Sequence, residues 1–218
     1  MSSVNRFHRL AGLLAAAIVL SACTVQLPVT PAPAAEMVTT PAAAAEAVTG
    51  ASAATDSTPA IACDGQPTPA QMEGPYYTPN PPQRASLIEE GVVGDPIMLT
   101  GYVLDTACRP IAGAVVDFWQ ADGAGVYDND GYRLRGYTLT DDAGRYTMET
   151  VVPGEYPGRT PHIHVKVQRP GGAVLTSQIY FPDEAANARD GIFNPALILD
   201  LQETANGLTG VMNFIVAP

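Results

Sequence analysis

The stretch IMLTGYVLDTACRPIAGAVVDFWQAD, residues 97–122, contains two apolar runs separated by the turn sequence TACRP. Short runs rich in Val, Ile and aromatic residues, bounded by Gly, Pro and Asp, indicate β-strands. The pattern continues in RGYTLT (135–140), RYTMETVV (145–152), HIHVKVQ (162–168), AVLTSQIYF (173–181) and GVMNFIVAP (210–218). Strands at this spacing, joined by turns such as DDAG and RPGG, predict an all-β sandwich.

The region before the last run is ambiguous. In ANARDGIFNPALILDLQETANG, residues 186–207, neither a helical nor a strand period is clear, and we expect one short helix there. The sequence shows no internal repeat and no sign of a second folded domain. We therefore expect a single β-sandwich domain over residues 61–218, which is long enough for one hydrophobic core.

The first 60 residues have the composition of an export signal and a linker. Arg6 and Arg9 precede the apolar run LAGLLAAAIVL (10–20), which is too short to span a bilayer and ends in LSAC (20–23). This pattern predicts a lipoprotein signal peptide over 1–22, with Cys23 lipidated at the periplasmic or extracellular face of the bacterial envelope. The alternative is an ordinary signal peptide. The Pro/Ala/Thr-rich remainder of 23–60 predicts a disordered tether.

The charge balance excludes two classes of partner. The chain has a formal net charge of −11 and a single lysine, Lys166. Nucleic acid and anionic lipid are therefore poor partners, and the only membrane contact we expect is through the N-terminal lipid.

Two cysteines remain besides Cys23, namely Cys63 and Cys108. In an exported protein such a pair predicts a disulfide rather than a metal site, and two free thiols are the alternative. Closing a loop of about 45 residues would stabilise the fold by roughly 4 kcal/mol in the chain-entropy model.

Two of the three histidines lie one residue apart in PGEYPGRTPHIHVKV, residues 153–167. Side chains two apart on a strand project from the same face, so His162 and His164 can bind one ion. The third, His8, lies in the predicted signal peptide, which excludes a zinc site with three histidines. Oxygen ligands must complete the shell of any metal here. The alternative is a pair of hydrogen-bonded surface histidines.

Tyrosine is the nearest source of such oxygen ligands. Tyr156 precedes the histidines, and a phenolate ligand requires a strongly charged cation such as Fe(III). Charge balance around one ferric ion then requires a second phenolate, for which Tyr127 in GAGVYDND (123–130) is the candidate.

Four stretches of the sequence together indicate a specific protein family. EGPYY (73–77), residues 99–127, TVVPGEYPGRTPHIHVKV (150–167) and QIYF (178–181) resemble the intradiol ring-cleavage dioxygenases, non-haem ferric enzymes that open catechols between the two hydroxyls. The resemblance covers nearly the whole predicted domain. It departs at one turn position, where Cys108 replaces the usual Gly or Ser; a disulfide to Cys63 would require a cysteine there.

The resemblance assigns roles to individual residues. It makes Tyr127, Tyr156, His162 and His164 the ligands of one Fe(III) per domain. Tyr156 would leave the iron as catechol binds and would accept a substrate proton. The remaining assignments are Arg159, which would stabilise negative charge on the ring, Gln178, which would line the pocket, and Gly74, Pro75 and Tyr76, which would wall the catechol site.

Each of these residues also has an ordinary alternative. The tyrosines could be strand-end and turn aromatics, Arg159 could form a surface ion pair, and Gln178 could face solvent. We expect Trp119 to belong to the core rather than to the site.

The implied activity is cleavage of a catechol-type ring with O2 to a muconate-type dicarboxylate, with iron(III) as the cofactor. A non-catalytic, prealbumin-like binding or stalk module shares the strand and turn pattern and is the first alternative. A hydrolase is the second, but the sequence has no GxSxG motif. The resemblance leaves open which catechol is the substrate and whether the protein forms a homo-oligomer.

Overall fold

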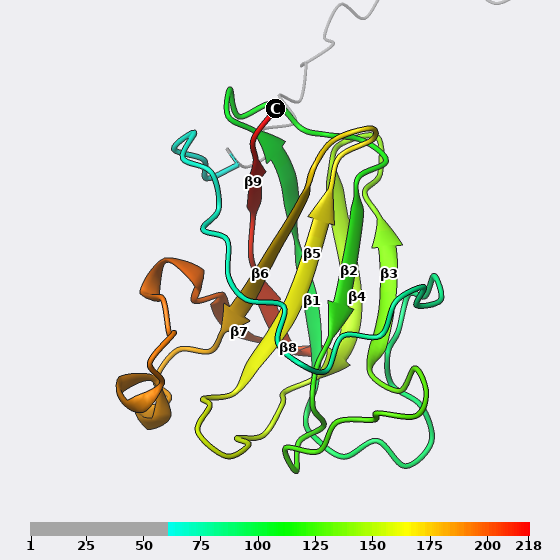
Figure 1. The fold of residues 1–218 in the computed structure, drawn as a ribbon. Helices are drawn as coiled ribbons and strands as arrows, with labels where there is room; N and C mark the ends of the chain where they lie inside the picture. The colour runs from blue at the N-terminus through cyan, green and yellow to red at the C-terminus, as the bar shows by residue number, and fades with distance from the viewer. Residues whose placement is uncertain (1–60) are drawn as a thin grey trace, which may run out of the picture. The chain divides into compact units, whose positions relative to one another are not determined.

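The computed structural model describes residues 61–218, which form two β-sheets (Figure 1). One sheet has four strands in the order β3-β2-β5-β6, and the other has five, in the order β4-β1-β8-β7 with β9 also paired to β1. The elements are β1 Pro96–Asp105, β2 Val115–Trp119, β3 Arg135–Leu139, β4 Arg145–Val151, β5 His162–Gln168, β6 Val174–Tyr180, η1 Ala185–Arg189, η2 Pro195–Leu197, β7 Asp200–Thr204, β8 Gly207–Val211 and β9 Phe214–Val216. The all-β sandwich predicted from the sequence is confirmed.

Alternation along the strands builds the core between the sheets. In β5 the side chains of Ile163, Val165 and Val167 are fully buried among core residues of both sheets. The intervening positions, His162 and His164 among them, therefore point to the outer face of the four-stranded sheet. The predicted bounds of β5 agree with the structure.

One glycine allows β1 to pair with two strands along the same edge. β1 pairs in parallel first with β8 and then with β9, and Met212 lies beside β1 between the two paired stretches. A Cβ on Gly101 would lie 1.8 Å from the carbonyl oxygen of Met212, so no other residue fits at this position.

The ambiguous region differs from the single short helix expected there. It contains two short 3-10 helices, η1 and η2, and an edge strand, β7. All five residues of β7 are exposed, so the strand has no apolar alternation by which the sequence could have revealed it. β7 forms because it pairs with β8 across the turn Ala205–Asn206.

The predicted disulfide between Cys63 and Cys108 is present. Cys108 has a φ of 61°, in the left-handed region that favours glycine, which agrees with the usual residue at this turn position. The bond attaches the start of the described chain to the turn between β1 and β2.

A segment without regular structure, residues 68–85, crosses the outer face of the four-stranded sheet (Figure 1). We call it the covering segment. Its backbone or side chains form hydrogen bonds with one residue on each strand of this sheet: Thr176 on β6, Lys166 on β5, Asp117 on β2 and Tyr137 on β3. It therefore encloses side chains that would otherwise project from this sheet into solvent.

Among residues 61–218 there is no helix long and apolar enough to cross a membrane. The predicted signal peptide, the lipidated Cys23 and the tether lie outside the described residues.

Candidate active site

The two histidines meet on the outer face of β5, beneath the covering segment. Their Nε2 atoms lie 3.1 Å apart, and both side chains are almost fully buried. The Nδ1 of His162 lies 2.7 Å from the carbonyl oxygen of Thr160. Because a carbonyl only accepts hydrogen bonds, this Nδ1 carries the proton, and the Nε2 of His162 keeps its lone pair.

Both imidazoles are neutral at physiological pH. Burial, together with the positive charge of Arg159, lowers the pKa of His162 to about 4. Burial and the neighbouring His162 hold the pKa of His164 well below its ordinary value. Neutral imidazole is the form that binds metals, so the pair is held in a ligand-competent state.

Two tyrosines lie against the histidines. The ring centroids of Tyr127 and Tyr156 are 5.6 Å apart, that of Tyr156 is 5.6 Å from His162 and that of Tyr127 is 6.5 Å from His164. Burial raises the pKa of both phenols. The hydroxyl of Tyr127 is buried and has no hydrogen-bond partner within the described chain, which is costly for a phenol that keeps its proton.

A glycine brings the two tyrosine loops together. Gly125 has a φ of 77°, and a Cβ there would lie 2.1 Å from the carbonyl oxygen of Glu155. The loop that carries Tyr127 can therefore pack directly against the loop that carries Tyr156 only with glycine at this position.

These four residues form a donor set that fits a hard, highly charged cation. In the part of the chain that the structure describes, no three His, Cys, Asp or Glu side chains gather in a way that could hold a metal. A metal in this cluster must therefore take phenolate oxygens. The unpartnered hydroxyl of Tyr127 and the two facing Nε2 atoms are satisfied if one cation binds among them.

Arg159 is fixed beside this cluster by a partner on each guanidinium nitrogen. Its Nε donates to Asp190 at 2.8 Å, its Nη1 to the hydroxyl of Tyr156 at 3.3 Å, and its Nη2 to Oε1 of Gln178 at 2.5 Å. The surface ion pair considered as an alternative is excluded, because the side chains of Arg159 and Asp190 are 16% and 1% exposed. The guanidinium charge is therefore held next to the Tyr156 oxygen.

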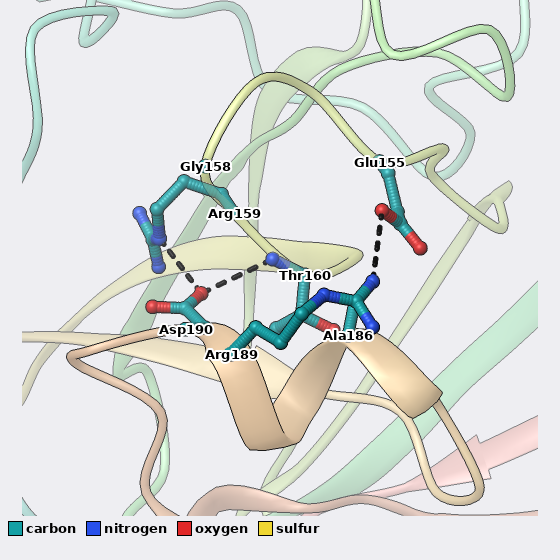
Figure 2. A pocket seen from close by; sticks show the side chains of 7 residues that line it. All are labelled: Glu155, Gly158, Arg159, Thr160, Ala186, Arg189 and Asp190. Carbon is teal, nitrogen blue, oxygen red and sulfur yellow. Dashed lines mark hydrogen bonds and ion pairs between the residues drawn. The ribbon is translucent and has the colours of Figure 1, made fainter.

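Asp190, which the sequence did not single out, connects the arginine to the histidines. Figure 2 shows its carboxylate between Arg159 and the backbone N–H of Thr160, which donates to the same oxygen at 3.1 Å. The residue lies directly after η1, on the rim of a small cavity of about 90 Å³ that Arg159, Thr160 and Arg189 also line. The carbonyl of Thr160 in turn accepts a hydrogen bond from the ring of His162. The carboxylate of Asp190 therefore supports both the Arg159 guanidinium and, through Thr160, the candidate metal ligand His162.

Gln178 is fully buried, which excludes the solvent-facing position left open by the sequence. Its Oε1 accepts the bond from Arg159 and its Nε2 donates to the carbonyl of Met72 in the covering segment. The hydroxyl of Tyr180, a second residue not predicted, has a single proton and lies within hydrogen-bond distance of Oε1 of Gln71, at 2.7 Å, and of Oε1 of Gln178, at 2.9 Å. Tyr180 was visible in the motif QIYF, but nothing in that motif separates its role from core packing.

The structure brings two of the three predicted wall residues to the cluster. A Cβ on Gly74 would lie 3.3 Å from Cε1 of His164, so this glycine backbone rests on the imidazole. The ring of Tyr76 stacks on Tyr127 with centroids 4.4 Å apart. Pro75, between them, is exposed.

The expected burial of Trp119 in a hydrophobic core is confirmed, but the residue lies in a small cluster with Tyr127 that is separate from the main core. Its indole stacks on the ring of His164 with centroids 4.8 Å apart and an interplanar angle of 10°. Trp119 ends β2 on the outer face, opposite His164 in the register, and the covering segment buries it there.

The chain is similar to several known proteins. Residues 72–214 match the family model described as Dioxygenase. The chain is 30% identical, over 58% of its length, to a catechol 1,2-dioxygenase of Candida albicans. It is 31% identical, over 59%, to a hydroxyquinol 1,2-dioxygenase of a Rhizobium species. It spans about half the length of these curated relatives, 51% and 53%.

Two solved structures match more completely. One is the dioxygenase domain of a dioxygenase carbohydrate-binding protein fusion from Streptomyces sp. SirexAA-E, with 47% identity and a TM-score of 0.67, covering 70% of this chain and 99% of that one. The other is an intradiol ring-cleavage dioxygenase from Tetranychus urticae, with 29% identity, a TM-score of 0.64 and coverage of 70% and 95%. The chain belongs to the family of intradiol ring-cleavage dioxygenases.

Proposed function

We propose that this domain binds one iron(III) through Tyr127, Tyr156, His162 and His164 and cleaves a catechol-type ring between its hydroxyls with O2. The product would be a muconate-type dicarboxylate. The observation that carries the proposal is the donor set itself: two neutral, buried imidazoles with their Nε2 atoms 3.1 Å apart, beside the phenol of Tyr127, which has no hydrogen-bond partner within the described residues. This set has no evident structural purpose without a cation.

The site residues have different roles in the proposed reaction. Iron(III), when bound, withdraws electron density from a bound catechol and so activates its ring towards O2. The Tyr156 oxygen accepts a proton from a substrate hydroxyl, because it can become a phenol whose oxygen still accepts a hydrogen bond from Arg159. Arg159 stabilises negative charge that develops on the ring.

The surroundings keep this charge out of water. Tyr76 and Gly74 close the cluster from the covering segment, and Trp119 closes it from the sheet. In such a partly dry site a fixed guanidinium interacts with a developing anion more strongly than it would in solvent. Gln178 and Asp190 keep the guanidinium in place, so that little reorganisation is needed during the reaction.

The substrate class follows from the relatives and from the donor set. Proteins similar to this chain are named for catechol, hydroxyquinol, 6-chlorohydroxyquinol and chlorocatechol. All of these compounds carry two adjacent hydroxyls, which one cation can bind together. We propose a substrate with this vicinal diol on an aromatic ring.

The test combines metal analysis with turnover. Purified protein should contain stoichiometric iron and be wine-red to brown from phenolate-to-iron(III) charge transfer. A panel of catechol, protocatechuate and hydroxyquinol, followed by oxygen uptake and mass spectrometry, should show both atoms of ¹⁸O2 in an acyclic dicarboxylate. A colourless protein that contains stoichiometric iron would refute the ligand set. Coloured protein with no turnover on any catechol would favour a binding module.

We also propose that the protein is exported and anchored by lipid at Cys23. The LSAC sequence supports this, and the disulfide between Cys63 and Cys108 suits an oxidising compartment. Mass spectrometry of the mature protein from its native membrane tests it. An N-terminus other than a diacylglyceryl-modified Cys23 would contradict the assignment.

A further inference from the structure

Four buried residues form a row across the outer face of the four-stranded sheet. In the register Arg135 on β3 lies opposite Trp119 on β2, Trp119 opposite His164 on β5, and His164 opposite Gln178 on β6. Residues opposite one another in neighbouring strands project from the same face. Each of the four is at most 1% exposed. Three of them belong to the donor set or contact it or Arg159, and Arg135 completes the row at its β3 end.

Arg135 is a buried cation without an acidic partner. No Asp or Glu among residues 61–218 forms an ion pair with it, whereas Arg159, the other arginine of the site, is paired with Asp190. Burial of a charge that no counter-charge neutralises is costly, which favours a role of Arg135 in the site over a contribution to stability.

The guanidinium of Arg135 instead bridges two segments of backbone. Its Nη1 donates at 2.5 Å to the carbonyl oxygen of Tyr76, in the covering segment. Its Nε donates at 3.2 Å to the carbonyl oxygen of Asp128, which also accepts from Nη2. Arginine suits this position because its rigid, planar fork donates in several directions at once. The bridge joins the covering segment to the loop that carries Tyr127.

Both ends of this bridge lie against Tyr127. The ring of Tyr76 stacks on that of Tyr127 with an interplanar angle of 24°, and Asp128 is the next residue along the chain. The guanidinium carbon of Arg135 lies 5.9 Å from the centroid of the Tyr127 ring, close enough for a cation–π contact. Arg135 therefore restrains Tyr127 through its stacking partner, through its backbone and directly.

The two candidate tyrosine ligands are held in different ways. The oxygen of Tyr156 accepts a hydrogen bond from Arg159, whereas the oxygen of Tyr127 has no hydrogen-bond partner within the described chain. A phenol whose oxygen is left available to a cation must be oriented through its ring and its backbone. Contacts of this kind, one step removed from the metal, orient metal ligands and set metal affinity.

We propose that Arg135 is a positioning residue of the candidate metal site. By bridging the covering segment to the loop of Tyr127, its guanidinium holds the Tyr127 oxygen in place for the cation. Arg135 itself contacts neither the cation nor the substrate. This inference rests on the proposed function, because it concerns a ligand of the proposed iron(III).

Competition for iron(III) with nitrilotriacetate tests the proposal. Arg135→Lys keeps the charge, but one ammonium nitrogen cannot occupy both ends of the fork. We expect it to weaken iron binding by about tenfold to a hundredfold, the usual effect of losing a contact that orients a metal ligand. Arg133→Lys is the matched control, since Arg133 lies two residues away and is exposed, and it should bind iron as the wild type does.

A double-mutant cycle identifies the ligand through which Arg135 acts. In a Tyr127→Phe background, which lacks the oxygen to be positioned, Arg135→Lys should have little further effect on iron affinity. In a Tyr156→Phe background it should keep its full effect. Wild-type iron affinity of Arg135→Lys, or a full additional loss in the Tyr127→Phe background, would overturn the proposal.

Amide hydrogen exchange of the full-length protein shows whether the effect is local, and it does not require iron. In Arg135→Lys, peptides that cover residues 74–78 and 126–130 should exchange about tenfold faster, while β1 and β4 of the other sheet keep wild-type rates. Unchanged exchange in the two segments, or faster exchange throughout both sheets, would also overturn it. Iron-loaded protein that turns over no catechol would contradict the dioxygenase assignment and leave this inference intact, whereas protein that binds no iron would overturn both.

Discussion

The carboxylate of Asp190 holds the guanidinium of Arg159 at 2.8 Å, across 31 positions of sequence. Both side chains are largely removed from water, and the arginine reaches the Tyr156 oxygen from this anchored position. The contact between Arg159 and Asp190 therefore fixes where the guanidinium charge lies within the candidate site.

Asp190→Asn should lower catechol turnover while iron remains bound. The amide removes a charge-assisted bond to Arg159, and losing such a bond costs about 1.5–3 kcal/mol, or about tenfold to a hundredfold in kcat. Steady-state kinetics and iron analysis on the same preparations provide the measurement. Arg189→Gln, on the rim of the same cavity and 69% exposed, is the control and should match the wild type.

A double-mutant cycle tests whether Asp190 positions Arg159 or only supports the fold. If Asp190 acts through Arg159, then Asp190→Asn should have little further effect on kcat in an Arg159→Ala background. Independent, additive losses would show that Asp190 supports the fold rather than the arginine.

The pH dependence of stability should reveal the buried carboxylate of Asp117. Burial, opposed by the hydroxyl of Tyr77 and by Lys166, raises its pKa from an ordinary value of 3.8 to about 6. Between these values the folded state binds more protons than the unfolded state, so the free energy of unfolding falls as pH rises. The Asp117→Asn variant has no carboxyl group at this position, so this contribution to the fall in its free energy of unfolding should be absent.

Denaturant unfolding of both proteins measures this difference. The variant should gain stability relative to the wild type between about pH 4 and about pH 7, and the change should be complete above the folded pKa. Both proteins carry the same candidate metal ligands, so pH-dependent metal binding cancels in the comparison. If the difference in free energy of unfolding between the two proteins is constant across this range, folding does not raise the pKa of Asp117.

The fold was predictable wherever alternation or turn chemistry is strong. β5 matches its predicted bounds, and its apolar alternation also showed that His162 and His164 share a face. β7 could not be found, because its five exposed residues carry no pattern and the strand exists only through pairing with β8.

The site was predictable where its residues lie close together in sequence. Tyr156, Arg159 and the histidines occupy one short stretch, and the structure brings Tyr127 to them. Asp190 was missed because its role depends on a tertiary contact with Arg159. The burial of Trp119 was predictable but its contact with His164 was not, because a tryptophan among apolar residues indicates burial but not which face of the sheet is buried.

Loss of the disulfide should destabilise the domain without removing the candidate site. The bond closes a loop with a sequence separation of 45. Cys63→Ser with Cys108→Ser should therefore lower the free energy of unfolding by about 4 kcal/mol. Cys63→Ser with Cys108→Gly should lose about 1 kcal/mol less, because glycine adopts a positive φ without strain. Thiol titration of unfolded, unreduced wild-type domain should find no free thiol from these two cysteines.

The two candidate tyrosine ligands should respond differently to loss of the phenol oxygen. Tyr156 is partly exposed and its hydroxyl accepts a hydrogen bond from Arg159, whereas the buried hydroxyl of Tyr127 has no hydrogen-bond partner among residues 61–218. Tyr156→Phe should keep the iron, since three protein ligands remain, but lose the group that accepts a catechol proton. A rise in the barrier of about 3 kcal/mol would lower the rate more than a hundredfold.

Visible spectra with and without catechol under anaerobic conditions distinguish the two variants. Tyr156→Phe should change the colour of the free protein but give a catechol complex with the wild-type spectrum, because that phenolate is absent from both complexes. Tyr127→Phe should change the spectrum in both states, since its phenolate remains a ligand throughout. The opposite pattern, with the catechol complex altered only by Tyr156→Phe, would reverse the two roles. It would also show that the contact between Arg159 and Tyr156 does not mark the ligand that leaves.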